Sequence, residues 1–240
     1  MMALILAGGK GTRLKPFTVS IPKPLMPLGD SPILEIVIRQ LRAAGVERIV
    51  LSLGHMAYFF TSFIERWERY GVRIDCCHED TPMGTAGSIA LVKDLEEDFL
   101  VMNGDLLTTL DFRALIQSHR ERKAWGTIAL ARRELKVDYG VVETAPDGRL
   151  ERYIEKPVIK YDVSMGINVL SRHCLEFIPR GQKFDLPDLM QAMRNAGKNV
   201  HGFHSDCYWQ DIGRFDDFQQ ASADFVENPG RFIPPDTVST

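Results

Sequence analysis

The sequence lacks several features that would assign it to a particular class of protein. No apolar run is long enough to span a bilayer, and the apolar residues 1–7 lead directly into glycines, with no basic leader or cleavage site. The net charge of −3 gives no general attraction to nucleic acid or anionic membranes. There is no internal repeat and no low-complexity segment. These absences favour a cytoplasmic globular protein without a nucleic-acid or membrane partner, in which any anion is bound by local charges.

Cysteine and histidine form no recognisable metal or redox pattern. The four cysteines are Cys76, Cys77, Cys174 and Cys207, and no pair has zinc-site spacing. The six histidines show no metal-ligand spacing either. We therefore expect reduced thiols, and chemistry that depends on other residues.

Short apolar runs alternate with segments of helical period, which is typical of a parallel sheet with crossover helices. Residues 48–53, 72–77 and 99–103 are predicted to be buried strands. Apolar residues at i, i+3, i+4 and i+7 predict helices around 34–41, 112–119 and 186–193. The predicted fold class is α/β, with a Rossmann-like, mainly parallel sheet flanked by helices.

The pattern changes in the second half of the chain. The predicted strands there, joined by short turns, are 126–131, 140–144, 150–154 and 164–171. We expect the subregion 126–171 to be an antiparallel insertion that forms one wall of a cleft. Three prolines and weak periodicity in residues 228–240 predict a tail or an arm. The predicted organisation is a single domain over 1–227 followed by that segment.

The most informative segment is the strand-like run that ends in glycines. Residues 1–7 open into Gly8-Gly9-Lys10-Gly11-Thr12-Arg13-Leu14, and Pro22-Lys23-Pro24 follows. Glycines let backbone N–H groups approach an anion without a Cβ in the way, and Arg13 and Lys23 add positive charge. The spacing is neither the Rossmann G-x-G-x-x-G nor the Walker-A ending G-K-[ST]. The segment predicts a phosphate-binding loop for a nucleoside triphosphate.

The string from Leu6 to Pro24 resembles the signature of the sugar-1-phosphate nucleotidylyltransferases, which make nucleotide sugars. The resemblance extends from Met2 to about Phe225, with its motifs in family order. It implies an enzyme whose substrates are a nucleoside triphosphate and a sugar 1-phosphate, with Arg13 and Lys23 as catalytic residues. The residues that it implies for nucleotide binding are Leu6, Ala7, Gly8, Gly9, Gly11, Thr12, Glu79, Gly84 and Thr85.

Two aspartates are candidates for a metal site. Asp105 follows an apolar strand, and ligands of open α/β sheets bind at the carboxyl ends of strands. Asp211 precedes Gly213 and, like Asp105, could by itself be a helix cap. The resemblance implies instead that both carboxylates bind Mg²⁺, an ion that prefers hard oxygen ligands and takes few from the protein.

The sugar phosphate is expected to bind at residues of the second half, again by resemblance. Lys156 would grip the phosphate, Glu155 would accept hydrogen bonds from sugar hydroxyls, and the Gly140 backbone would contact the sugar. Ser164 and Asn168 lie on the following strand and depart from the pattern usual in mannose-specific members, which leaves the sugar open.

The base-binding loop is expected at residues 78–87. A carboxylate has only acceptors, so Glu79 suits guanine, which offers two neighbouring donors. The run Gly84-Thr85-Ala86-Gly87 is most similar to mannose-1-phosphate guanylyltransferases, which implies GTP and mannose 1-phosphate. The alternatives are a heptose-1-phosphate guanylyltransferase, a glucose-1-phosphate uridylyl- or thymidylyltransferase, and a non-catalytic regulatory homologue. The sequence is compatible with a homo-oligomer and does not decide the oligomeric state.

Overall fold

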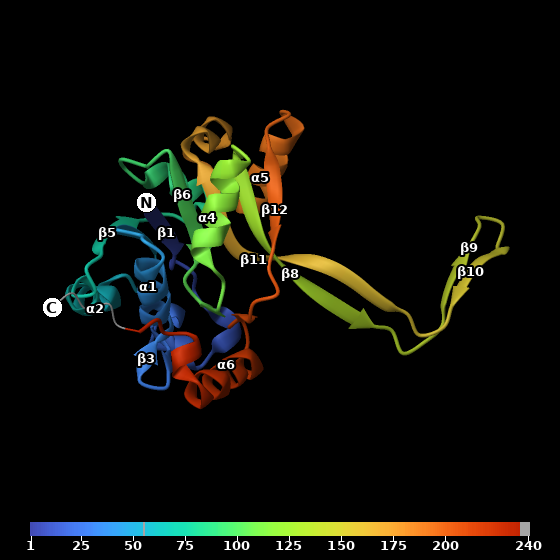
Figure 1. The fold of residues 1–240 in the computed structure, drawn as a ribbon, viewed down its shortest axis with the longest axis horizontal. Coiled ribbons are helices and arrows are strands. Elements are labelled where there is room, and N and C mark those ends of the chain that lie inside the picture. The colour runs from blue at the N-terminus through green and yellow to red at the C-terminus, as the bar shows by residue number, and fades with distance from the viewer. Residues whose placement is uncertain (55, 236–240) are drawn as a thin grey trace.

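A seven-stranded sheet forms the centre of the structure, a computed structural model that describes residues 1–54 and 56–235 (Figure 1). In sheet order its strands are β12 (Val200–His204), β8 (Gly126–Lys136), β11 (Val158–Ser171), β6 (Asp98–Asn103), β1 (Met2–Leu6), β4 (Arg48–Leu53) and β5 (Arg73–His78). Neighbours run parallel, except that β11 is antiparallel to both β6 and β8. The predicted α/β fold, mainly parallel with an antiparallel insertion, is confirmed.

The central strand β1 is buried on both faces, as its continuous apolar sequence predicts. Because successive side chains of a strand point to opposite faces, Ala3 and Ile5 join one core cluster and Met2 and Leu4 join another. On the Ala3 side lie α1 (Ile33–Ala43), α2 (Tyr58–Glu68) and α4 (Phe112–Glu121). The opposite side is covered by α3 (Gly84–Gly87) and α5 (Leu186–Asn195). The three predicted helices correspond to α1, α4 and α5.

Local sequence signals explain where several helices begin. Asp111 accepts a hydrogen bond from the Ala114 N–H at the start of α4 (3.0 Å). Pro187 lies in the first turn of α5, where a missing N–H costs nothing. At α6 (Phe215–Glu227), the Asp217 carboxylate accepts from the N–H of the preceding Arg214 (2.8 Å). The cap of this helix is therefore formed by Arg214 and Asp217, and not by Asp211 as the sequence alone would allow.

The carboxyl ends of the parallel strands meet at one edge of the sheet, and short elements gather there. β7 (Leu106–Thr108) pairs antiparallel with β13 (Trp209–Asp211), and β2 (Pro27–Leu28) pairs with β3 (Ser31–Pro32). These pairs and α6 share a third apolar cluster, which includes Leu28, Leu107 and Phe225. The short 3₁₀ turns are Thr12–Leu14, Phe17–Val19, Lys23–Leu25, Ser88–Leu91, Arg172–Phe177 and Pro229–Arg231.

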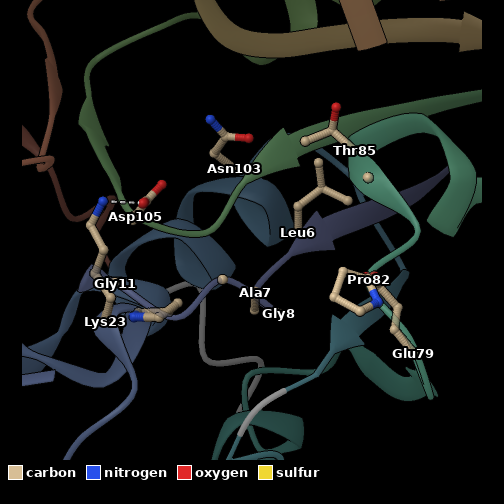
Figure 2. A pocket seen from close by; sticks show the side chains of 13 residues that line it. Leu6, Ala7, Gly8, Gly11, Lys23, Glu79, Pro82, Thr85, Asn103 and Asp105 are labelled. Atoms are coloured by element: carbon tan, nitrogen blue, oxygen red, sulfur yellow. Dashed lines mark ion pairs between the residues drawn. The ribbon is translucent and has the colours of Figure 1, made fainter. Parts of the chain in front are cut away.

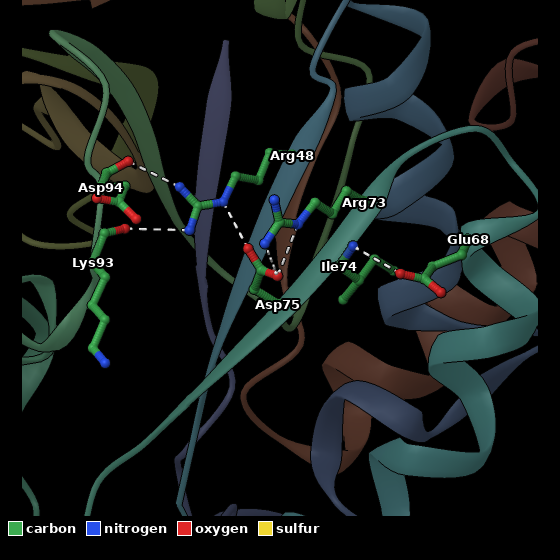
Figure 3. Close-up of polar contacts among 7 residues, drawn as sticks. All are labelled: Arg48, Glu68, Arg73, Ile74, Asp75, Lys93 and Asp94. Atoms are coloured by element: carbon green, nitrogen blue, oxygen red, sulfur yellow. Dashed lines mark hydrogen bonds and ion pairs between the residues drawn. The ribbon is translucent and has the colours of Figure 1, made fainter.

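At the opposite, amino-terminal ends of β4 and β5, an aspartate is held by two arginines (Figure 3). Arg48 Nε donates to Asp75 Oδ2 (2.7 Å), and Arg73 Nε donates to Asp75 Oδ1 (3.0 Å). Arg48 also donates to the carbonyl oxygens of Lys93 (3.2 Å) and Asp94 (2.9 Å). This cluster ties the edge strand β5 to β4 and to the segment that leads into β6.

β8 and β11 continue beyond the body as a two-stranded ribbon, and we call residues 132–162 the arm (Figure 1). The ladder runs out to the pair of Val158 with Lys136, and the hairpin of β9 (Val141–Thr144) and β10 (Leu150–Ile154) lies at the far end. The structure differs here from the expected cleft wall. Because β8 and β11 are longer than their predicted segments, they carry the outer half of the insertion away from the sheet.

The carboxyl-terminal segment docks on the body as far as the structure describes it. Phe232 is buried against the rings of Tyr208 and Phe225, and its carbonyl accepts a hydrogen bond from Gln40 Nε2 (2.8 Å). Of the predicted tail over 228–240, residues 236–240 lie outside the described residues. No helix within the described residues combines the length and apolarity needed to cross a membrane.

Candidate functional site

Two adjoining cavities lie at the carboxyl end of the sheet and share Thr85 and Asn103 in their linings. The first, which we call the glycine-loop cavity, has a volume of about 320 Å³ (Figure 2). The second, which we call the adjoining cavity, has about 550 Å³. Asp105 lines the first and Asp211 lines the second, so the two carboxylates mark the junction.

The glycine-loop cavity is built where β1 ends. A Cβ on Gly8 would come within 3.2 Å of the Gly54 backbone nitrogen, so glycine avoids a tight contact where this turn passes the end of β4. Gly11 has φ of +58°, and its carbonyl accepts a hydrogen bond from Thr18 Oγ1 (2.7 Å). The predicted nucleotide residues that line this cavity are Leu6, Ala7, Gly8, Gly9, Gly11, Glu79, Gly84 and Thr85. Thr12 begins an exposed turn and is not part of the lining.

Strand pairing brings the two predicted metal ligands together from distant parts of the chain. In the β7–β13 pair, Asp211 lies opposite Leu106, the residue after Asp105. The Ile212 N–H donates to the Asp105 carbonyl (3.2 Å), which extends this pairing. Lys23 Nζ makes an ion pair with Asp105, and it lies 4.0 Å from Asp211 Oδ1 (Figure 2 shows the first contact).

The charges of this cluster are not balanced at short range. Lys23 is 8% exposed and its ammonium group is directed at the carboxylates. Partial burial raises the pKa of Asp211, and the charge of Asp105 raises it further, while Lys23 and Arg13 act in the opposite direction. Two carboxylates thus share one close lysine, and they repel each other.

Arg13 also lies near this cluster, and its positive charge acts to lower the pKa of Asp211. A Cβ on Gly213 would lie 3.5 Å from the terminal guanidinium nitrogens of Arg13, which places the side chain beside the residues that follow β13. The side chain of Arg13 is exposed, whereas that of Lys23 is buried. The structure therefore brings both predicted catalytic cations to the acidic pair, one held by packing and one open to solvent.

The predicted base-binding loop is held by contacts that the sequence does not reveal. Ser52 Oγ donates to Glu79 Oε1 (2.7 Å), and the Met83 N–H donates to Glu79 Oε2 (3.0 Å). The Thr85 N–H donates to Asp185 Oδ1 (3.0 Å), and Thr85 Oγ1 accepts from the Leu186 N–H at the start of α5 (2.8 Å). These contacts lock the loop between β4 and α5.

Asn103, Gly166 and Trp209 shape the cavities although the sequence analysis did not select them as site residues. Asn103 lines both cavities, and its amide would be 2.6 Å from a Cβ on Gly166, which has φ of +70°. Trp209 Nε1 donates to the Met165 carbonyl (2.9 Å) and fixes the wall of the adjoining cavity. For Asn103 a signal existed, namely its place at the carboxyl end of a buried strand.

The predicted sugar-phosphate residues separate into two groups. Ser164 and Asn168 line the adjoining cavity. Gly140, Glu155 and Lys156 lie on the arm instead, Gly140 before β9 and the other two between β10 and β11. The structure does not bring these three to the cleft of their own chain, because the β8–β11 ladder holds that part of the arm away from the body (Figure 1).

Comparison with known proteins agrees with this geometry. Residues 2–228 match the model of the nucleotidyl transferase family. The chain belongs to this family. It is 36% identical to the mannose-1-phosphate guanyltransferase of Schizosaccharomyces pombe over 91% of this chain, and 32% identical to the UTP–glucose-1-phosphate uridylyltransferase of Synechocystis sp. over 92% of it. The chain spans 62% of the length of each of these relatives.

A solved structure of similar length has the same fold. HddC from Yersinia pseudotuberculosis, crystallised in complex with GMP-PN, is 27% identical and superposes with a TM-score of 0.71. The match covers 93% of this chain and 99% of that chain. The family membership expected from the glycine-loop string is thereby confirmed.

Proposed function

We propose that this chain transfers a nucleotidyl group from a nucleoside triphosphate to a sugar 1-phosphate and releases pyrophosphate. The observation that carries the proposal is the cluster of Lys23, Asp105 and Asp211 at the junction of two cavities. A reaction between two phosphorylated substrates needs a site for each and charged groups where they meet. The names of the relatives support the same reaction class.

The glycine-loop cavity is the proposed nucleotide site. Its turn of small residues leaves backbone N–H groups free of side chains, which suits a triphosphate. The adjoining cavity is the proposed sugar site, with Ser164 and Asn168 at its wall. Gly140, Glu155 and Lys156 remain the proposed contacts to the sugar and its phosphate, although they lie on the arm.

The acidic pair has the chemistry of a magnesium site. Its donors are hard carboxylate oxygens, and their mutual repulsion contributes to the raised pKa of Asp211. Within residues 1–54 and 56–235 there is no group of three or more His, Cys, Asp or Glu side chains that could bind a metal ion. Two carboxylates with phosphate and water ligands match the preference of Mg²⁺, which when bound would neutralise phosphate charge. Asp105 and Asp211 are the residues proposed to hold it.

The proposed reaction is an in-line displacement at phosphorus. An oxygen of the sugar 1-phosphate attacks the α-phosphorus, the bond to the bridging oxygen breaks, and pyrophosphate leaves. The second pKa of a phosphate monoester is about 6, so the attacking oxygen is already anionic at neutral pH and no general base is needed. Arg13 and Lys23 stabilise the charge that develops on the leaving group, and Lys156 orients the attacking phosphate.

We propose GTP as the preferred triphosphate and mannose 1-phosphate as the preferred acceptor. Each oxygen of Glu79 accepts one hydrogen bond from the protein, and a carboxylate oxygen can accept more than one. Glu79 lines the glycine-loop cavity, so its remaining acceptors can face the two donors of guanine. A heptose phosphate with GTP, or glucose 1-phosphate with UTP or dTTP, is the alternative.

A matrix assay tests the reaction and the substrates together. Each of GTP, ATP, UTP, CTP and dTTP is combined with mannose, glucose and heptose 1-phosphates, and pyrophosphate release is measured. We expect the highest kcat/KM for GTP with mannose 1-phosphate. A different preferred pair would refute the specificity and keep the reaction class. Absence of release with every pair would refute the reaction and favour a non-catalytic regulatory protein.

The role of Glu79 has its own test. In Glu79→Gln one acceptor becomes a donor that faces a guanine donor, which should lower kcat/KM for GTP about tenfold. The same change should be neutral for UTP and dTTP, whose N3–H and carbonyl can pair with an amide. Ser52→Ala is the matched control, because it loosens the loop without changing the group that faces the base. Equal losses for all bases in Glu79→Gln would mean that Glu79 only supports the loop.

A further inference from the structure

The arm has two chemically different faces. On one face the pairs Arg132–Asp162 (3.4 Å) and Glu134–Lys160 (3.3 Å) form cross-strand ion pairs. The other face carries Leu135, Ile159 and Tyr161, which are 52%, 45% and 45% exposed, with Arg133 opposite Tyr161. Directly opposite residues of an antiparallel pair share a face, so the pairing of Ile159 with Leu135 places them together.

The apolar face of the arm is a continuation of the protein core. Two residues further in, Val163 lies opposite Ala131, and both pack in the core cluster beneath the sheet. Where the same face leaves the body, Arg133 lies over the ring of Trp209, and beyond it Leu135 and Ile159 are exposed. A two-stranded ribbon is marginally stable by itself, and an exposed apolar stripe of this kind is typical of an interaction surface.

The adjoining cavity lacks the charge that its proposed ligand needs. Among the described residues that line it there is no lysine, arginine or histidine, and one of them is Asp211. A sugar 1-phosphate is nearly a dianion at neutral pH. Lys23, which is buried and lines the glycine-loop cavity, already pairs with Asp105. The lining of the adjoining cavity therefore offers no cation to the phosphate of the acceptor, and Arg13 lies beside Asp211 at its margin.

The arm carries a lysine that matches this deficit. Lys156 is exposed between β10 and β11, and among the described residues no carboxylate lies within ion-pair distance of it. Its φ of +45° is uncommon for a residue other than glycine, and such conformations concentrate at functional sites. The arm thus presents an unpaired cation, and the lining of the adjoining cavity contains none among the described residues.

Lys156 cannot reach the cleft of its own chain without loss of the ladder. Val158 lies six residue steps along β11 from Ser164, which lines the adjoining cavity, and a strand of that length spans about 20 Å. Folding back would break the β8–β11 pairs of the arm and both of its ion pairs. A second copy related by a two-fold axis needs no such change, because each copy can insert its arm into the other.

We infer that two copies of this chain exchange arms, so that Lys156 and Glu155 of each copy complete the sugar-phosphate cavity of the other. The apolar face of the arm is covered in the same contact, and a single two-fold interface completes both clefts. This inference rests on the proposed function for the identity of the ligand, but the exchange of arms can be measured separately.

Complementation between two inactive variants tests the exchange. Lys156→Ala removes the arm cation, and Asp105→Asn disables the cleft. A hetero-dimer of the two variants is isolated with two different affinity tags. If the arms are exchanged, the cleft of the Lys156→Ala chain keeps its own Asp105 and receives Lys156 from the Asp105→Asn chain. We expect about half of the wild-type rate, because one of two clefts is complete. If each chain used its own arm, both clefts would be defective and the hetero-dimer would be as slow as its parents.

Lys160→Ala is the matched control, since Lys160 is also on the arm but lies on its ion-paired face. This variant should retain the wild-type KM for the sugar 1-phosphate. If the wild-type protein is active but the hetero-dimer of the two variants is not, the exchange of arms is overturned and the proposed reaction is left intact.

A crosslink decides the exchange without any activity. One chain carries Lys156→Cys and the other carries Gln191→Cys at the adjoining cavity, with Cys76, Cys77 and Cys207 replaced by serine and the buried Cys174 retained. Under mild oxidation we expect a disulfide that joins the two differently tagged chains. A Lys160→Cys chain in place of Lys156→Cys should not form it. Absence of the mixed crosslink, with a monomer in sedimentation, would overturn the inference even if no substrate had been found.

Discussion

Carboxylates at the two ends of the central sheet show opposite charge balance. At the amino-terminal ends of β4 and β5, Asp75 accepts hydrogen bonds from both Arg48 and Arg73 (Figure 3). At the carboxyl ends, Asp105 and Asp211 lie beside a single close cation, Lys23 (Figure 2). One end has more cations than carboxylates at contact distance, and the other has fewer.

The pKa shifts reflect this difference. Partial burial raises the pKa of Asp75, but the hydrogen bonds from Arg48 and Arg73 outweigh burial and lower it overall. Burial also raises the pKa of Asp211, and there the charge of Asp105 adds to the increase. A carboxylate that the protein already satisfies contributes to stability, whereas an unsatisfied pair is a place where ligands can bind.

The largest effect should come from breaking the carboxyl-end pair. Asp105→Asn removes a charge proposed to hold Mg²⁺, and we expect kcat to fall by about 1,000-fold or more with the fold intact by circular dichroism. Wild-type activity should vanish in EDTA and return with Mg²⁺. Asp75→Asn, at the other end of the sheet, should leave kcat within about two-fold of wild type. Full activity in EDTA, or in Asp105→Asn, would remove the metal site from the proposal.

Loss of the exposed cation at the carboxyl end should have the next largest effect. Arg13→Ala should lower kcat by about 10–100-fold while KM for the triphosphate changes little, because Arg13 acts on charge that shifts during the reaction. Arg48→Ala is the comparison, since it removes an arginine of the amino-end cluster. A loss of kcat in both variants would indicate a general structural effect.

The amino-end cluster should affect stability and show a defined pH dependence. Asp75→Asn should lower the free energy of unfolding by about 1–2 kcal/mol at pH 7, measured with urea. Because the folded pKa of Asp75 is lowered, its contribution is present above the unfolded value of about 3.9 and is lost as pH falls through the folded value. The gap between wild type and variant should therefore close below about pH 4. A constant gap at all pH values would mean that the charge is not its origin.

The smallest effect should have the opposite sign. In EDTA at pH 7, Asp211→Asn should raise the free energy of unfolding by up to about 1 kcal/mol, a limit set by the 47% exposure of the side chain. The folded pKa of Asp211 is raised, so the cost of its charge appears as pH rises through that value and is absent below about pH 3.9. Thermal unfolding at pH 3.5 and pH 7 would measure the difference. Destabilisation at pH 7 would show that Asp211 is already satisfied within the protein.

The sequence alone predicted the parts of this molecule that depend on local pattern. The strands β1, β4 and β6 follow from short apolar runs, and α1, α4 and α5 follow from apolar residues at helical spacing. Glycines after β1 predicted the turn that now lines a cavity. The position of Asp105 after an apolar strand was also readable, because both lie within a few residues of sequence. The role expected of Asp211 came only from the family resemblance.

Only the tertiary structure decided which distant residues meet. Thr85 pairs with Asp185 and Glu79 with Ser52, and no periodicity in the sequence links either pair. The arm is the clearest case, because the same alternating pattern suits a strand that covers a cleft and one that leaves the body. The lengths of β8 and β11 and their register are set by pairing between strands, and they alone place Lys156 away from Asp105. Local propensity specifies a strand, but only its partners specify where the strand goes.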